Sequence, residues 1–183
     1  MPSDLFAPLP TARLHMRAPA LQDAAALSAL KTPFVSKGLA SWPSPFTPQM
    51  ARQRIESVRS AAARGDALPC VITLRDGKAL AGWVALHRIP ESPGRAALSY
   101  WLGMAYHGHG YAGEAARALI QAGFTRLGLE VIEAGAQLEN AASFAVMRAC
   151  GMAAAGERMV YASSRDRDER CGFYEISRPP GPI

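Results

Sequence analysis

The stretch YHGHGYAGEAARALI, residues Tyr106–Ile120, decides how the rest of the chain is interpreted. Its letters GHGYAG, residues Gly108–Gly113, satisfy the pattern G-x-G-x-x-G that opens a helix at the pyrophosphate in dinucleotide-binding folds. Small residues expose consecutive backbone N–H groups at the positive end of a helix, and such groups bind anions of any kind. The stretch therefore predicts a phosphate site, unless the glycines merely start a helix.

A NAD-type fold is the first hypothesis for this loop. In that fold the glycines follow a parallel strand directly, and an acidic residue about twenty positions further on binds the ribose. Glu130 and Glu133 lie near that spacing. However, the preceding strand is predicted to end near Leu102, and the strands before it form an antiparallel meander. The chain after the loop is also too short for a second nucleotide-binding half, so the context disfavours a nicotinamide cofactor.

The composition of the whole chain is that of an ordinary globular protein. Of its 183 residues, 49% are hydrophobic and 19% are charged, which favours one domain with a real core. Its formal net charge of +5 favours anionic partners. The densest charged stretch, RDRDER at residues 165–170, alternates its signs and predicts a solvated turn. We expect no nucleic-acid partner, because such a partner needs a patch of one sign.

The cysteines and the N-terminus favour a cytoplasmic location. Cys70, Cys150 and Cys171 are odd in number and widely spaced, as expected of buried thiols in a reducing compartment. Residues 1–10 contain an acidic residue and prolines where a signal peptide needs basic and apolar regions, and no apolar run has membrane-spanning length. We therefore expect no membrane partner.

Periodicity and capping signals predict the elements of the first half. Alternation of apolar and polar side chains predicts a strand over residues 13–17, and an Ala- and Leu-rich stretch predicts a short helix over residues 21–30. Prolines, serines and glycines predict an irregular loop over residues 31–46. A helix over residues 48–64 is predicted with Thr47 as its N-cap.

The second half predicts a meander followed by alternating strands and helices. A tight turn at Asp76-Gly77 joins the first two strands of the meander. The helix after the glycine loop carries an apolar stripe, and the next helix has Asn140 as its N-cap and Gly151 at its end. The predicted strands are residues 68–74, 79–87, 95–103, 130–138, 157–163 and 172–177.

These elements and several separated motifs resemble the GNAT superfamily of acetyl-CoA-dependent N-acetyltransferases. The phosphate-loop pattern of that family, Gln/Arg-x-x-Gly-x-Gly/Ala, falls on residues 107–112 and matches well from Gly110 onward. The stretches YWLGMAYHGHGYAGEA, IEAG, NAAS and WPSPFT resemble the branch that includes the ribosomal-protein N-terminal acetyltransferases. The resemblance extends over residues 11–177.

The resemblance implies an α+β fold with three layers, α/β/α, in which helices flank a mixed, mostly antiparallel sheet. One acetyltransferase domain is implied over residues 11–178, between a flexible segment, residues 1–10, and a tail, residues 179–183. A homodimer formed through an edge strand is left open by the sequence.

The resemblance also implies acetyl-CoA as co-substrate. Amides of the glycine loop would hold the pyrophosphate, and main-chain groups at the end of the preceding strand would contact the pantetheine. One amide of a splayed strand would polarise the acetyl carbonyl. No metal is expected, because His107-x-His109 has no matching cysteine or carboxylate cluster. The implied cofactor-binding residues are Leu102, Gly103, Met104, His107, Gly108, His109, Gly110, Tyr111, Ala112, Asn140 and Ser143.

The implied reaction is direct attack of a primary amine on the thioester in a ternary complex, which requires two proton transfers. Relatives often place a Glu where this chain has Ala97 and a Tyr where it has Met147. We therefore expect Glu133 as a substitute base, unless it makes only a structural hydrogen bond. Ser143 is the expected proton donor, unless it serves the cofactor or the helix start.

The acceptor is predicted to be a protein N-terminal α-amine or a small amine. An α-amine has a pKa of about 7.7–8.0 and a lysine about 10.4, so an α-amine needs less help from a base. Trp42 lies in the loop that lines the acceptor site in relatives, so it is an expected substrate contact, with core packing as the alternative. Ala97 and Met147 also permit a silent acyl-CoA-binding or sensor protein of the same fold.

Overall fold

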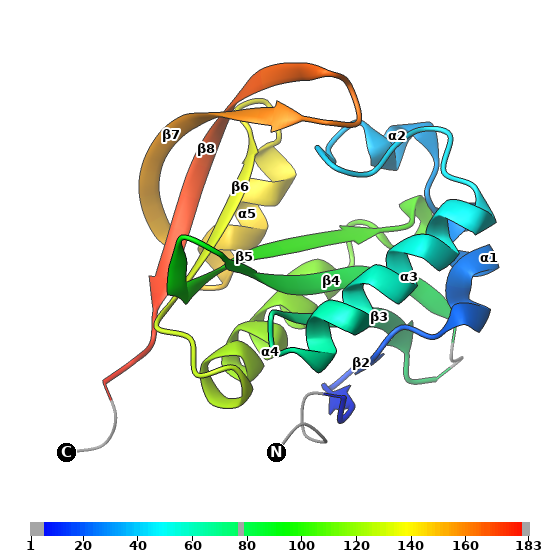
Figure 1. Cartoon of the computed structure of the whole chain (residues 1–183), viewed down its shortest axis with the longest axis horizontal. Coiled ribbons are helices and arrows are strands. Elements are labelled where there is room, and N and C mark those ends of the chain that lie inside the picture. Colours follow the sequence, from blue (N-terminus) through cyan, green and yellow to red (C-terminus); the bar gives the residue numbers. More distant parts are fainter. Residues whose placement is uncertain (1–5, 77–78, 181–183) are drawn as a thin grey trace.

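The computed structural model describes residues 6–76 and 79–180, which form one eight-stranded sheet with helices on both faces (Figure 1). The strand order is β1-β2-β3-β4-β5-β6-β8-β7, and of the described pairs only β5 and β6 are parallel. The predicted α+β class with a mixed, mostly antiparallel sheet is confirmed.

The elements follow the predicted order. The strands are β1 (Leu9–Pro10), β2 (Leu14–Arg17), β3 (Ala67–Leu74), β4 (Leu80–Ile89), β5 (Ser92–Leu102), β6 (Val131–Gln137), β7 (Ala153–Ala162) and β8 (Arg167–Ser177). The helices are η2 (Leu21–Asp23), α1 (Ala24–Leu30), α2 (Pro33–Ser36), α3 (Pro48–Ala63), η3 (Met104–Tyr106), α4 (Tyr111–Arg126) and α5 (Ala141–Ala149).

Two hydrophobic cores lie on opposite faces of the sheet. One core packs the sheet against α4 and α5, and its largest buried side chains include Leu86, Leu119 and Ile132. The other packs the sheet against α1 and α3 around Trp83. Because successive side chains of a strand point to opposite faces, each central strand contributes to both cores.

The predicted caps set the helix boundaries. The Thr47 hydroxyl accepts a hydrogen bond from the Met50 N–H at 3.2 Å, and the Asn140 amide oxygen accepts one from the Ser143 N–H at 3.1 Å. Gly65 and Gly151 follow α3 and α5 with φ of +79° and +78°, a conformation that glycine adopts without steric cost. Both capping predictions are confirmed.

The loop over residues 31–46 is more ordered than its composition predicts. It contains α2, whose N-cap Thr32 accepts a hydrogen bond from the Val35 N–H. Buried Lys31 donates hydrogen bonds to the Ser36 hydroxyl and to the carbonyl oxygens of Trp42 and Pro43. The prediction of a wholly irregular loop is therefore wrong, because local capping and one buried ammonium organise the segment.

The N-terminal segment was predicted to be flexible through residue 10, but its last two residues form a strand. Leu9 and Pro10 form β1, which pairs with Met16 and His15 of β2. Residues 1–5, Gly77 of the predicted turn, and residues 181–183 of the predicted tail lie outside the described residues.

Candidate functional site

The site begins where β5 and β6 separate. These strands pair only from Arg95–Ala97 to Val131–Glu133, although β5 continues to Leu102. The N–H of Gly103 donates to the Ala81 carbonyl on β4 at 2.8 Å. Backbone groups of a strand alternate in direction, so the N–H groups of Leu102 and Tyr100 face the open side, toward β6. The expected splayed strand is therefore present.

The glycine loop lies at the end of β5 and leads directly into α4. Gly108 and Gly110 both have φ of +77°, and Gly110 is the N-cap of α4. Apart from its two chain neighbours, no residue in the described part of the chain has an atom within 4 Å of a Cβ built on Gly108. The first amides of a helix have no intrahelical partner, so Tyr111, Ala112 and Gly113 present N–H groups toward the loop. This geometry suits an anion at the positive end of a sixteen-residue helix.

Two residues just before β2, Thr11 and Arg13, hold this loop in place. The Glu114 carboxylate accepts hydrogen bonds from the Thr11 hydroxyl at 2.6 Å and from the Arg13 N–H and Nε at 2.8 and 2.7 Å. Arg13 also donates to the His109 carbonyl at 2.8 Å and lies over the Tyr111 ring. Burial opposes ionisation of Glu114, but these contacts lower its pKa overall. The sequence analysis missed this support, because 101 residues separate Arg13 from Glu114.

Several groups that were expected to bind the cofactor form hydrogen bonds within the protein instead. His107 donates from Nε2 to the Leu102 carbonyl at 2.9 Å, and His109 donates from Nδ1 to the His107 carbonyl at 2.7 Å. The Gly103 N–H is held by β4, which leaves the amides of Leu102 and Met104 as the better candidates for binding a ligand. The two histidines thus shape the loop through its backbone.

Tyr100 and Ser143 contact each other from β5 and α5. The two hydroxyl oxygens are 2.8 Å apart, and the Tyr100 hydroxyl also donates to the Ser143 carbonyl at 3.1 Å. Burial raises the pKa of Tyr100 to about 12, while the bond to Ser143 acts in the opposite direction. Asn140 already caps α5, so the Ser143 hydroxyl is not needed at the helix start. Met147, at the position of the family tyrosine, is 1% exposed and belongs to the core.

Glu133 lies on the opposite face of the sheet, in a row with His87 and Ala97. His87 pairs with Ala97, and Ala97 pairs with Glu133, across β4, β5 and β6. The Glu133 carboxylate forms ion pairs with Arg158 and with Arg95, the latter at 3.1 Å. Together with Ala97, these three residues line a cavity of about 470 Å³. Glu133 is thus buried, paired with two arginines and open to a cavity on this face.

Trp42 is part of the second core. Its side chain is 4% exposed and packs edge-on against Trp83 and Trp101, with ring centroids 5.4 and 5.1 Å apart. The structure places Trp42 in the core between the sheet, α1 and α3, and not on the surface. Direct contact with a substrate stays a prediction for this residue.

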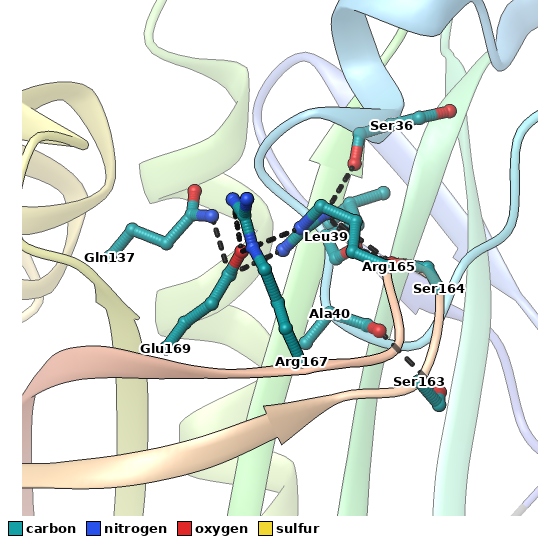
Figure 2. Close-up of polar contacts among 9 residues, drawn as sticks. All are labelled: Ser36, Leu39, Ala40, Gln137, Ser163, Ser164, Arg165, Arg167 and Glu169. Atoms are coloured by element: carbon teal, nitrogen blue, oxygen red, sulfur yellow. Dashed lines mark hydrogen bonds and ion pairs between the residues drawn. The ribbon is translucent and has the colours of Figure 1, made fainter.

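The turn between β7 and β8 reaches across the site to the segment after α2 (Figures 1 and 2). Arg165 donates to the carbonyl oxygens of Leu39 and Ser36, and the Ser164 N–H donates to the Ala40 carbonyl at 2.9 Å. Figure 2 shows Glu169 between Arg165 and Arg167, where it also accepts a hydrogen bond from Gln137 at 2.6 Å. The Glu169 side chain is 9% exposed.

This arrangement corrects the prediction of a solvated turn at residues 165–170 only for Arg165 and Glu169, because Asp166, Arg167, Asp168 and Arg170 are exposed as predicted. Arg165 and Glu169 form a partly buried ion cluster that joins the hairpin to the loop over residues 31–46. Alternating signs in sequence did not indicate this, because the acceptors of Arg165 are backbone carbonyl oxygens more than 120 residues away.

Replacing Glu169 with Gln is expected to remove a pH-dependent part of the stability. Ion pairs with Arg165 and Arg167 lower the pKa of Glu169 from 4.5 to about 2. A carboxylate with a lowered pKa stabilises the folded state fully above pH 4.5, by about 3 kcal/mol at neutral pH. This stabilisation is lost as the pH falls toward 2. Urea unfolding between pH 7 and pH 3 should show that the wild-type advantage shrinks below about pH 4.5.

The matched control for this prediction is Asp66→Asn, which breaks the exposed ion pair of Asp66 with Arg64. Exposed pairs contribute little, so this variant should change stability by less than about 1 kcal/mol at every pH. Equal effects of the two substitutions would contradict the role assigned to Glu169.

Three further observations concern the cysteines, metal-binding groups and membrane-spanning helices. Cys70, Cys150 and Cys171 are free and buried. Within residues 6–76 and 79–180, no three His, Cys, Asp or Glu side chains form a group suited to a metal ion. Over the same described ranges, no helix is long and apolar enough to cross a membrane.

Comparisons with known proteins agree with this architecture. A family model described as the acetyltransferase (GNAT) domain matches residues 13–153. The uncharacterized N-acetyltransferase p20 of Bacillus licheniformis is 31% identical over 159 residues, which are 86% of this chain and 88% of that protein.

Solved structures of acetyltransferases share the fold. RimL, a ribosomal L7/L12 α-N-protein acetyltransferase in complex with coenzyme A, has a TM-score of 0.80 at 21% identity, covering 93% of this chain and 98% of that one. The ribosomal-protein-S5-alanine acetyltransferase from Vibrio fischeri has a TM-score of 0.78 at 20% identity, covering 93% and 96%. The family model and the curated relative show that the chain belongs to the GNAT family of acetyltransferases.

Proposed function

We propose that the protein transfers the acetyl group of acetyl-CoA to a primary amine by direct attack in a ternary complex. The observation that carries the proposal is the glycine loop with two positive-φ glycines, Gly108 and Gly110, placed between the open edge of β5 and the N-terminus of α4. The structural neighbour RimL in complex with coenzyme A supports the same co-substrate here.

In this proposal the amides of residues 108–112 bind the pyrophosphate, because they lie at the positive end of a helix, whereas the His107 N–H already donates to the Met104 carbonyl at 3.2 Å. The N–H groups of Leu102 and Met104 take the pantetheine arm, since they are directed away from β4 or begin the η3 turn. Asn140 acts on the site by holding the first turn of α5, which carries Ser143. Acetyl-CoA supplies the activated acetyl group and a thiolate leaving group.

Ser143 is the proposed donor of a proton to the departing thiolate. A serine hydroxyl is a weak acid, so it acts as a relay that accepts a proton from water while it gives its own proton to the thiolate. Tyr100 contacts the Ser143 oxygen at 2.8 Å and orients it from the neighbouring strand. Tyr100 therefore supports proton donation by Ser143. Met147, which stands where relatives often have a tyrosine, is buried and cannot donate this proton.

Glu133 is the proposed acceptor of the ammonium proton, directly or through water. Its carboxylate is held in place by ion pairs with Arg95 and Arg158. An α-ammonium, with a pKa of about 7.7–8.0, needs less help from a base than a lysine ammonium, with a pKa of about 10.4. The proposed acceptor is therefore a protein N-terminal α-amine or a small amine of similarly low pKa.

We expect an N-terminal α-amine to react about 10²-fold faster, in kcat/KM at pH 7, than a lysine in the same peptide with its N-terminus blocked. The α-amine is roughly one-tenth unprotonated at this pH and the lysine less than about one-thousandth. Release of CoA thiol from acetyl-CoA measures both rates. Equal rates at pH 7, or a preference for lysine, would contradict the proposed acceptor class.

A further inference from the structure

A second cavity, of about 400 Å³, lies between α3, β4 and the segment over residues 43–46. Its polar lining consists of Gln53, Arg54, Ser57 and His87, and none of the described residues that line it is acidic. A concave site with several hydrogen-bond donors and no carboxylate is suited to an anionic ligand.

Arg54 is the charged group of this cavity. Its guanidinium lies 4.2 Å from the centre of the Trp42 ring and donates to the Ser41 carbonyl, contacts that hold the side chain in position. Among the described residues it forms no ion pair. Burial lowers the pKa of Arg54, as expected of a desolvated cation without a counter-charge. A bound anion would supply that charge.

The cavity adjoins the row formed by His87, Ala97 and Glu133 across β4, β5 and β6. His87, which lines it, pairs with Ala97 on β5, and β5 and β6 separate directly after the Ala97–Glu133 pair. Leu86, Leu98 and Ile132 belong to the core under α4, so the alternation of side chains turns His87, Ala97 and Glu133 to the opposite face. Residue 97 is alanine, so it places no long side chain between His87, which lines one cavity, and Glu133, which lines the other.

The charges of the two cavities differ. On the β6 side, Arg95 and Arg158 are matched by the carboxylates of Glu133 and Glu175. On the β4 side, the charge of Arg54 is unmatched within the cavity. An acceptor that spans this face thus meets paired charges near Glu133 at one end. At the other end it meets the guanidinium of Arg54, which has no carboxylate partner within the cavity.

We propose that the Arg54 cavity binds an anionic group of the acceptor, so that the preferred substrate is an amine that also carries a carboxylate or phosphate. The inference rests on the proposed function for the identity of the amine, but the binding of the anion does not require turnover. Arg54 donates to the anion through its planar fork, and Gln53, Ser57 and His87 add hydrogen bonds.

The test is calorimetric titration of the full chain, in the presence of CoA, with acetylated product-type ligands. C-terminally amidated peptides of the form acetyl-Ala followed by three residues carry Asp at the second, third or fourth position, or Asn throughout, and N-acetyl-β-alanine, compared with its amide, represents a small anionic acceptor. We expect at least one anionic ligand to bind about tenfold more tightly than its neutral counterpart. Peptide and small-molecule arms distinguish the two sources of the anion.

Arg54→Gln should remove this preference, and Arg54→Lys should retain part of it, because lysine keeps the charge without the fork. The control is Arg52→Gln, an exposed arginine on the same helix outside the cavity. Absence of any charge preference in the wild type, or its persistence in Arg54→Gln, would overturn the proposal. Charge-dependent binding without transfer to any amine would support it and contradict the proposed function alone.

Discussion

Replacing Gly110 with Glu is expected to weaken acetyl-CoA binding by about 100-fold or more. The substitution places a carboxylate against the proposed pyrophosphate site and forces a residue with a side chain to adopt φ of +77°. A Cβ at this position has room, since its nearest neighbour is an Arg13 nitrogen at 3.5 Å, so charge and backbone conformation cause the loss. Calorimetric titration with acetyl-CoA, CoA and NADH measures the effect.

Gly65→Glu is the matched control for this experiment. Gly65 has φ of +79°, and nothing lies within 4 Å of its Cβ position, so the variant has similar backbone strain and the same added charge away from the loop. It should bind acetyl-CoA like the wild type. Equal losses in both variants, or a preference of the wild type for NADH, would contradict the role assigned to the loop.

Replacing Ser143 with Ala is expected to lower kcat by about 10²-fold while leaving acetyl-CoA affinity within a few-fold, because a positioned proton donor contributes about 10²–10⁴ to rate. Stability should change little, since Asn140 and not the Ser143 hydroxyl caps α5. Rapid-mixing kinetics of CoA thiol release give kcat, and titration gives the affinity.

Two further variants separate catalysis from structure at this position. Ser143→Thr keeps a hydroxyl and should recover part of the rate. Tyr100→Phe removes the phenol that contacts the Ser143 oxygen at 2.8 Å and should lower kcat by less than Ser143→Ala does. Wild-type kcat in Ser143→Ala would show that the serine does not donate the proton.

Local signals in the sequence were sufficient for the helix boundaries and for the glycine turn that begins α4, and the family resemblance implied the sheet architecture. Thr47 and Asn140 cap helices through their own side chains, and Gly110 supplies a backbone conformation that its neighbours in sequence require. Such signals act over a few residues, so periodicity and residue type reveal them. The splayed strand followed from the family resemblance, and the β5–β6 register bears it out.

Contacts between distant elements could not be predicted in this way. Tyr100 meets Ser143 across 43 residues, and Arg165 meets Leu39 across 126 residues. The charge balance of Glu133 also depends on Arg95 and Arg158, which belong to two other strands. Strand register and hairpin docking bring these groups together, and neither is encoded in the spacing of one segment.

Amine-dependent release of CoA thiol tests the central claim most directly. The full chain is incubated with acetyl-CoA, with and without a peptide that has a free N-terminus, and mass spectrometry locates the acetyl group. The proposed function predicts thiol release that depends on the peptide and an acetyl group on its α-amine. Binding of acetyl-CoA without peptide-dependent release across a broad panel of amines would contradict it and indicate an acyl-CoA-binding protein.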